Sequence, residues 1–236
     1  MMTKTIPGAV LTGLTLFSLA ALSSEPFKAL APELKAWLPH VTLKFILIVL
    51  SFAAARLLGV PFSELSLAAI PFDSKRRSKF ILMALLLGAV GSSFVLAFGI
   101  PRMQVLNGLS VGQVILTIWL WSSIAEEIFA RGFVQGLLKN EGNVLIGGLS
   151  LSKGGWASAI VFSLIHLAIF VGGGALPTTI TIMTLTFLLG LLTAKTREEM
   201  NLRSAIYVHI AFNVGGALGG IITNLISLIA FGKRLA

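Results

Sequence analysis

Polar side chains interrupt three apolar stretches in the second half of the chain. They are Glu126, Glu127, Arg131, His166, His209 and Asn213. Carboxylates and imidazoles are the groups that enzymes most often use to move protons, and imidazole and amide N–H groups can stabilise developing negative charge. Ionisable groups are costly inside a membrane, where they usually face a bundle interior or a wet cavity. We therefore predict that these residues share one interior site.

Helical spacing divides the first group into two parts. Glu127 and Arg131 are four residues apart, so they can pair on one face of a helix, whereas Glu126 is turned away by about 100°. The pair alone is typical of a buried structural ion pair. Glu126 has no evident partner in the sequence, so we expect Glu127 to be structural and Glu126 to be available for chemistry.

The two histidine motifs are ambiguous when taken singly. His166 follows Phe162 by four residues, and Asn213 follows His209 by four. A single histidine in a span also suits an interhelical hydrogen bond. The third histidine, His40, is expected in a loop. Because three separate spans place polar groups at similar depth, a shared site is favoured over three independent hydrogen bonds.

Composition sets the class of protein that holds this site. Hydrophobic residues make up 56% of the 236 residues, charged residues 11%, and the mean hydropathy is +0.95. Soluble domains average about 25% charged residues, so we predict an all-α polytopic membrane bundle, with residues 1–236 as a single domain. The net charge of +9 lies beside apolar spans, which argues against a nucleic-acid partner. The absence of cysteine excludes disulfides and thiol catalysis.

Hydropathy predicts about eight spans. Their expected ranges are 6–22, 41–59, 80–100, 111–138, 156–171, 177–194, 204–218 and 219–231. A cleaved signal peptide is the alternative for 6–22, and 25–40 is expected to lie on the bilayer as an interfacial loop. The small residues Ala84, Gly88 and Ser92 predict close helix packing. The glycines between 215 and 220 predict either a break or close packing.

Orientation follows from counting basic residues on alternate sides of eight spans. Fourteen lysines and arginines fall on one side and four on the other. The positive-inside rule then predicts that both termini are cytoplasmic. We expect an integral protein of a prokaryotic cytoplasmic membrane, with its site opening toward the cytoplasm and a membrane-anchored peptide or protein as substrate.

The three motifs resemble those of a known family. EEIFAR from Glu126, FSLIH from Phe162 and HIAFN from His209 resemble the EExxxR, FxxxH and HxxxN/D motifs of the CPBP family. This family comprises the CAAX proteases and bacteriocin-processing enzymes, also called the ABI or type II CAAX prenyl endopeptidase family. The resemblance covers residues 119–213, inside an expected catalytic core at 111–218.

The resemblance implies an intramembrane glutamic protease without a cofactor. Glu126 would be the general base, assisted by His166. His209 and Asn213 would stabilise the oxyanion, and Glu127 would pair with Arg131. Phe162 would support the site. Prenylated CAAX-type, leader-peptide and sorting-tail substrates all fit the resemblance.

Other classes of function remain open from the sequence. Two histidines and a glutamate could bind zinc in a metalloprotease, although there is no HExxH motif. Buried glutamate, arginine and histidine are also typical of transporters, for which inverted repeats are expected and none is evident. A silent scaffold of the same fold is the remaining alternative.

Overall fold

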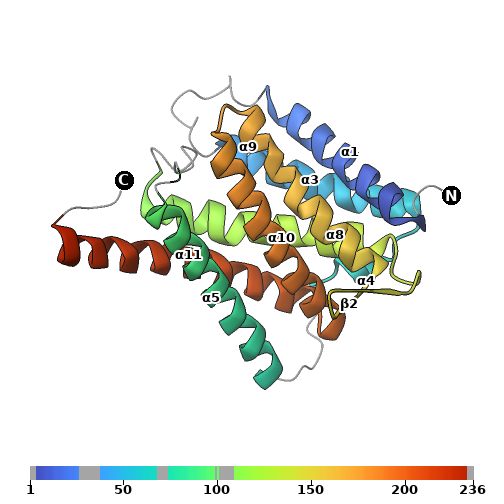
Figure 1. Cartoon of the computed structure of the whole chain (residues 1–236). Coiled ribbons are helices and arrows are strands. Elements are labelled where there is room, and N and C mark those ends of the chain that lie inside the picture. Colours follow the sequence, from blue (N-terminus) through green and yellow to red (C-terminus); the bar gives the residue numbers. More distant parts are fainter. Residues whose placement is uncertain (1–3, 27–37, 68–73, 99, 101–108, 233–236) are drawn as a thin grey trace.

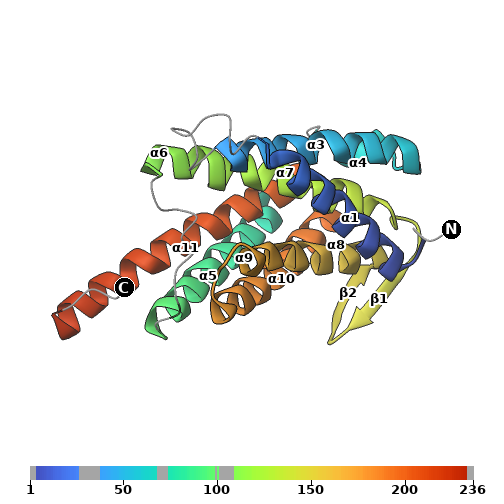
Figure 2. The same cartoon turned by 90° about the horizontal axis from the view of Figure 1, so that it is seen from above.

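The computed structural model describes residues 4–26, 38–67, 74–98, 100 and 109–232. Long helices dominate it (Figures 1 and 2). The helices before the fourth span are α1 Ile6–Ser24, α3 Leu38–Leu58, α4 Phe62–Leu65 and α5 Ser74–Ala97. The fourth span consists of α6 Val111–Gln113, η4 Val114–Ser122, α7 Ser123–Glu127 and η5 Ile128–Val134. The remaining elements are β1 Asn143–Ile146, β2 Leu149–Ser152, α8 Lys153–Leu164, η6 Ile165–Leu167, α9 Ala168–Val171, α10 Leu176–Glu199 and α11 Leu202–Phe231.

Seven helices of the described chain are long and apolar enough to cross a membrane. The all-α polytopic fold is therefore confirmed, but the division of residues 204–231 into two spans is wrong. α11 runs unbroken from Leu202 to Phe231. The glycines within it do not break the helix, and two of them, Gly215 and Gly219, allow close packing against α5. The prediction that both termini are cytoplasmic depended on an even number of spans and loses that support.

Glycines bring α5 and α11 into direct backbone contact. A Cβ atom added at Gly215 would lie 2.2 Å from the Leu85 carbonyl oxygen, and one added at Gly88 would lie 2.1 Å from the Phe212 carbonyl oxygen. Such distances are far inside van der Waals contact, so only hydrogen fits there. The predicted small-residue packing is confirmed, and it fixes α11, which carries His209 and Asn213, against α5.

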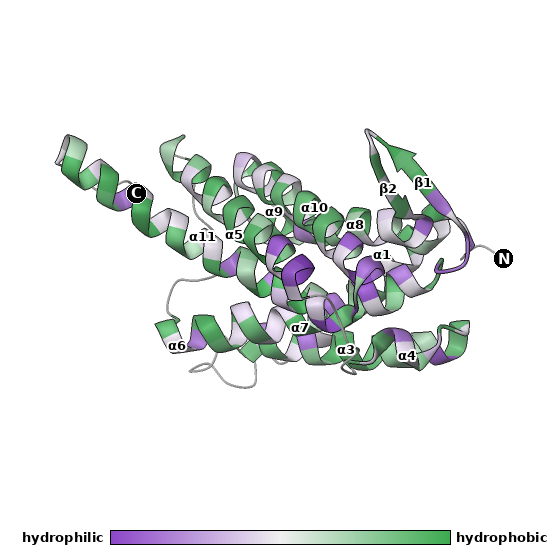
Figure 3. Ribbon diagram, turned by 90° about the horizontal axis from the view of Figure 1, so that it is seen from below, coloured by the Kyte–Doolittle hydropathy of each residue, from purple (hydrophilic) through white to green (hydrophobic). Residues whose placement is uncertain are grey.

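The spans that carry Glu126 and His166 are the most enclosed. Within its most apolar window, the fourth span is 50% buried and the Lys153–Val171 span 56%, compared with 17–39% for the other five. The long helices display mainly hydrophobic residues along their outer faces (Figure 3). Apolar outer faces suit contact with lipid, so polar residues on the two enclosed spans face protein.

The fourth span changes helix type around the glutamates. Residues 114–122 and 128–134 are π-helical, and residues 123–127 between them are α-helical. π-Helical turns are rare in proteins overall, but many of those that occur lie at functional sites. Side-chain directions along this span therefore differ from those of a regular α-helix, although Glu127 and Arg131 still lie on one side.

A two-stranded hairpin connects the fourth span to α8, and no strand was predicted there. β1 pairs with β2 in antiparallel register, and the turn at Gly147 and Gly148 has φ angles of +57° and +81°. Paired glycines between two apolar runs are a type I′ hairpin signal that the sequence offered. The indole Nε1 of Trp156 donates to the Val144 carbonyl at 3.0 Å, and the Lys195 Nζ donates to the Ser150 carbonyl at 3.1 Å. These bonds fix the hairpin to α8 and α10.

Ion pairs gather at the end of the bundle that holds the hairpin. Glu64 of α4 pairs with Lys139 at 2.6 Å and with Arg197 of α10 at 2.8 Å. Arg76 of α5 pairs with Glu199 at 2.7 Å. We call this the basic end of the bundle, defined by Lys75, Arg76, Arg77, Lys79, Lys139 and Arg197.

Helix α1 is part of the packed bundle. Its residues Ile6, Val10, Leu14 and Phe17 pack against the central core. A helix that packs against the core in this way is typical of a span that stays in the mature protein. The packing therefore disfavours the signal-peptide alternative for this segment. The interfacial loop predicted at 25–40 falls mostly outside the described residues.

Candidate active site

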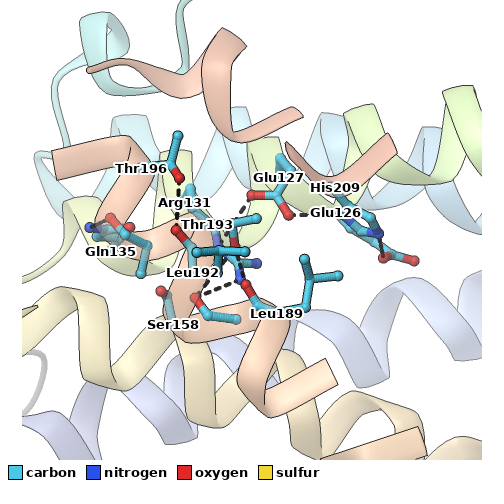
Figure 4. A network of polar contacts seen from close by, with 12 residues as sticks. Glu126, Glu127, Arg131, Gln135, Ser158, Leu189, Leu192, Thr193, Thr196 and His209 are labelled. Atoms are coloured by element: carbon cyan, nitrogen blue, oxygen red, sulfur yellow. Dashed lines mark hydrogen bonds and ion pairs between the residues drawn. The ribbon is translucent and has the colours of Figure 1, made fainter. Parts of the chain in front are cut away.

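The predicted pair of Glu127 and Arg131 is present and fully buried. Arg131 Nε lies 3.2 Å from Glu127 Oε2, and its Nη2 donates to the Gly190 carbonyl of α10 at 3.1 Å. Neither side chain is exposed. Figure 4 shows Glu127 between Arg131 on one side and His209 on the other. The pair thus ties the fourth span to α10 and α11.

Phe162 is the centre of an aromatic cluster around this pair. The Arg131 guanidinium lies 4.4 Å from the Phe162 ring centroid, which suits a cation–π contact. The rings of His166 and His209 meet the same phenyl ring edge-on at 5.3 and 5.4 Å. Phe162 therefore packs against Arg131 and both histidines.

Glu126 has a partner that the sequence analysis missed. The Nζ of Lys44, on α3, contacts Glu126 Oε1 as both a hydrogen bond and an ion pair. Both side chains are largely buried. The expectation that Glu126 is unpaired is therefore wrong. Lys44 lies in the first third of α3, so in sequence it is indistinguishable from a flanking charge.

His209 contacts both glutamates. Its Nδ1 lies 2.9 Å from Glu127 Oε1, and its Nε2 lies 3.8 Å from Glu126 Oε2. Because the Glu127 carboxylate already pairs with Arg131, Nδ1 is the nitrogen that donates to it. Nε2 is then the ring atom directed toward Glu126. One turn along α11, the Asn213 amide donates to Ser123 Oγ at 3.1 Å, which leaves its second N–H for other partners.

His166 has a defined tautomer. Its Nδ1 lies 2.7 Å from the Phe162 carbonyl oxygen of its own helix. A carbonyl can only accept, so Nδ1 carries the proton and the neutral ring keeps its lone pair on Nε2. Nε2 is therefore available to take a proton from a neighbouring group.

A cavity of about 710 Å³ joins these residues. Glu126, His166, His209 and Asn213 all line it, together with Lys44. The four predicted residues, which come from three spans, thus line one cavity, as expected from the sequence. Their catalytic roles stay predictions. Glu127 and Arg131 do not line the cavity and lie behind it.

The cavity does not reach the basic end. After Glu126 in the sequence, the fourth span lies in the hydrophobic core, where Phe129, Phe133 and Val134 are fully buried. The exposed residues that line the cavity, Ala168 and Gly173 among them, lie around the turn between α9 and α10 at the other end. The expected opening of the site toward the cytoplasm stays a prediction.

The described part of the chain contains no cluster of side chains of the kind that usually binds a metal ion. No group of three or more histidine, cysteine, aspartate or glutamate residues is placed there to hold an ion. Glu126, which lines the cavity, already accepts a hydrogen bond from Lys44 at its Oε1 atom, so this oxygen is not available as a metal ligand. Whether activity survives chelation of metal decides the point experimentally.

Fold and site together define an integral membrane protein with a carboxylate–histidine cluster at the inner end of a cavity. Residues 109–215 match the family model described as type II CAAX prenyl endopeptidase, Rce1-like. This match extends from the start of the fourth span into α11 and includes all three motifs, so the family resemblance is confirmed for this region. The family is one of CAAX-type membrane endopeptidases. No curated protein and no solved structure matches the chain.

Proposed function

We propose that this chain is an intramembrane endopeptidase in which Glu126 activates water for attack on a peptide bond. The observation that carries the proposal is that Glu126, His166, His209 and Asn213 line one cavity within membrane-spanning helices. Peptide hydrolysis needs a base for water, donors for the oxyanion and a proton for the leaving amine. Each requirement has a candidate group among the residues that line the cavity.

The base is Glu126, with His166 as its partner. Lys44 binds Glu126 Oε1, so Oε2 is the oxygen that remains for water. The proton that leaves water passes to Glu126 as the water oxygen bonds to the substrate carbonyl carbon. The lone pair on His166 Nε2 can then receive that proton and deliver it to the nitrogen as the C–N bond breaks.

Lys44 gives Glu126 its charge and its position. An ammonium in contact favours the ionised carboxylate, which is the form that accepts a proton from water. It also fixes the side chain so that one oxygen faces the cavity. We therefore assign Lys44 as a positioning residue for the base.

The oxyanion is stabilised from α11. Asn213 has an N–H beyond the one donated to Ser123, and His209 directs Nε2 toward the cavity when Nδ1 is held by Glu127. His209 Nε2 donates to the oxyanion when it also carries a proton. Both groups stand on a helix locked to α5 by glycines, so they meet developing charge with little reorganisation.

The experiment is cleavage by purified protein of a panel of peptides. The panel contains a farnesylated peptide with a CAAX terminus and unprenylated apolar peptides, with products identified by mass spectrometry. We expect wild type to cleave at least one member, and Glu126→Gln and His166→Ala to cleave none while eluting as folded protein. Glu141→Gln, which changes a carboxylate in the turn after the fourth span, is the matched control and should keep activity. Cleavage by Glu126→Gln at the wild-type rate contradicts the proposal.

A further inference from the structure

We propose that the tip of the β1–β2 hairpin, residues 145–148, inserts into the interface of the lipid bilayer, and that the lysines at the base of the hairpin bind anionic lipid headgroups. None of the hairpin residues lines the cavity, so this interaction is independent of the proposed function. Four features of the described residues support it: an exposed apolar tip, a fixed attachment to the bundle, an open strand edge and a basic base.

The tip of the hairpin is apolar on both faces. Leu145 is 70% exposed and Ile146 is 55% exposed, and the two turn glycines beside them are exposed as well. Successive side chains of a strand point to opposite faces, so these two residues cover both sides of the tip. No charged residue occurs between Glu141 and Lys153, and Figure 3 shows β1 as largely hydrophobic. Exposed apolar surface of this kind marks a contact with protein or membrane. Immersion in lipid covers both faces at once.

The hairpin is fixed to the bundle, with its tip at the side. Val144 packs against the core cluster that contains Trp156 of α8 and Ala194 of α10. At the end of β2, Ser152 donates its hydroxyl and its backbone N–H to Glu198 Oε1 at 2.6 and 2.9 Å. Figure 2 shows the hairpin extending past α8 and α10, on the side away from α3 and α4. Because α8 and α10 belong to membrane spans, the tip projects into the lipid that surrounds them.

The open edge of β1 limits how deep the hairpin lies. Among the described residues β1 pairs with β2 alone, so its outer edge has no strand partner. Open sheet edges do not occur in the hydrocarbon region, where unpaired N–H and C=O groups find no partner. At the level of the headgroups, water and polar lipid groups can bond to these atoms. The hairpin therefore lies at the interface, and the Leu145 and Ile146 side chains reach the acyl chains.

Lysines surround the base of the hairpin. Lys139 precedes β1 and Lys153 follows β2, and the Lys195 Nζ bonds to the Ser150 carbonyl between them. The Lys139 side chain is 57% exposed although it pairs with Glu64. An apolar tip with ammonium groups behind it suits a surface in which acyl chains lie beneath phosphates. Basic residues at such a surface attract anionic lipid. The charges therefore favour a bilayer that contains anionic lipid over a second protein as the partner of the tip.

Fluorescence of labelled cysteines tests this directly, because the chain has no native cysteine. Leu145→Cys and Ile146→Cys each place an NBD fluorophore at the tip. Asn140→Cys, in the exposed turn before β1, is the aqueous reference, and Leu86→Cys, 57% exposed midway along α5, is the lipid reference. Each variant is reconstituted in vesicles of phosphatidylcholine and phosphatidylglycerol. Quenching is measured with aqueous iodide and with either lipid carrying a nitroxide on one acyl chain.

We expect both tip labels to emit at shorter wavelength than the Asn140 label, and to be quenched by nitroxide lipid but only weakly by iodide. Nitroxide phosphatidylglycerol should quench them about two- to fivefold more than the same mole fraction of nitroxide phosphatidylcholine, the enrichment of anionic lipid that one lysine near the surface produces. The double variant Lys139→Gln, Lys153→Gln should remove this excess, and the matched double variant Lys139→Arg, Lys153→Arg should keep it.

Three results would overturn the proposal. Tip labels that iodide quenches as strongly as the Asn140 label show a tip in water. Tip labels shielded from both iodide and nitroxide lipid show a tip covered by protein, such as a second copy of the chain. Equal quenching by the two nitroxide lipids overturns the binding of anionic headgroups by the lysines. None of these measurements requires proteolysis, so their outcome is separate from that of the Glu126→Gln cleavage assay.

Discussion

Replacing Glu127 by glutamine should destabilise the protein far more than the same change at Glu126. Glutamine keeps the volume of glutamate, so the comparison isolates charge. Without the Glu127 carboxylate, Arg131 stays fully buried with the Gly190 carbonyl and the Phe162 ring as its remaining contacts. Arg131 Nη1 has no hydrogen-bond acceptor among the described residues even in the wild type.

The magnitude follows from the burial of the pair. Removing one partner of a buried ion pair costs about 3–5 kcal/mol because the other charge is left uncompensated. His209 also loses a charged hydrogen-bond acceptor, so we expect the loss of stability from Glu127→Gln to lie near the upper end of this range. Glu126 and Lys44 face the cavity, where water can solvate the remaining ammonium. We expect Glu126→Gln to cost about 1–2 kcal/mol, between the values for exposed and buried pairs.

The assay is reversible unfolding in mixed micelles with increasing SDS, followed by the fluorescence of the four tryptophans. The double variant Glu127→Gln, Arg131→Met removes the stranded charge and should recover part of the loss. Equal destabilisation by the two glutamine variants, or a larger loss at Glu126, would refute the division of the glutamates into a structural and a cavity-facing residue.

Three further predictions follow from the site and its supports. Lys44→Met should lower kcat by about 10²–10⁴-fold with little change in KM, the size of effect expected when the general base Glu126 is no longer held ionised and in position, and Lys44→Arg should restore part of the rate; an unchanged kcat would exclude the positioning role. Gly215→Ala should lower the stability and activity of the protein because the new methyl group meets the Leu85 carbonyl, while Gly216→Ala, whose nearest atom is 3.9 Å away, should behave as wild type in both measurements. Proteolysis should survive removal of metal by chelators, and loss of activity that zinc restores would support the metalloprotease instead.

Sequence reasoning found the parts of the site that are local along a helix. Glu127 and Arg131 pair because they are four residues apart, and the two histidine motifs were conspicuous because polar groups are costly within membrane spans. Lys44 could not be found this way. It is 82 residues from Glu126 in the chain, and only the packing of α3 on the fourth span brings the two together.

The same limit applies to the shape of the molecule. Hydropathy located every long helix, but the glycines of α11 suggest a break or close packing equally well until α5 is seen against them. The position of each polar group along its helix was predictable from the sequence. The direction in which the cavity opens was not, because it depends on which half of the bundle is filled by Phe129, Phe133 and their neighbours.

Single-turnover cleavage in ¹⁸O-labelled water tests most directly whether Glu126 activates water. Wild type and Glu126→Gln, matched for folded fraction, are mixed in excess with the peptide that wild type cleaves best. The account predicts that wild type places one ¹⁸O atom in the new carboxyl group and that Glu126→Gln forms no product. Labelled product from Glu126→Gln at the wild-type rate would contradict it.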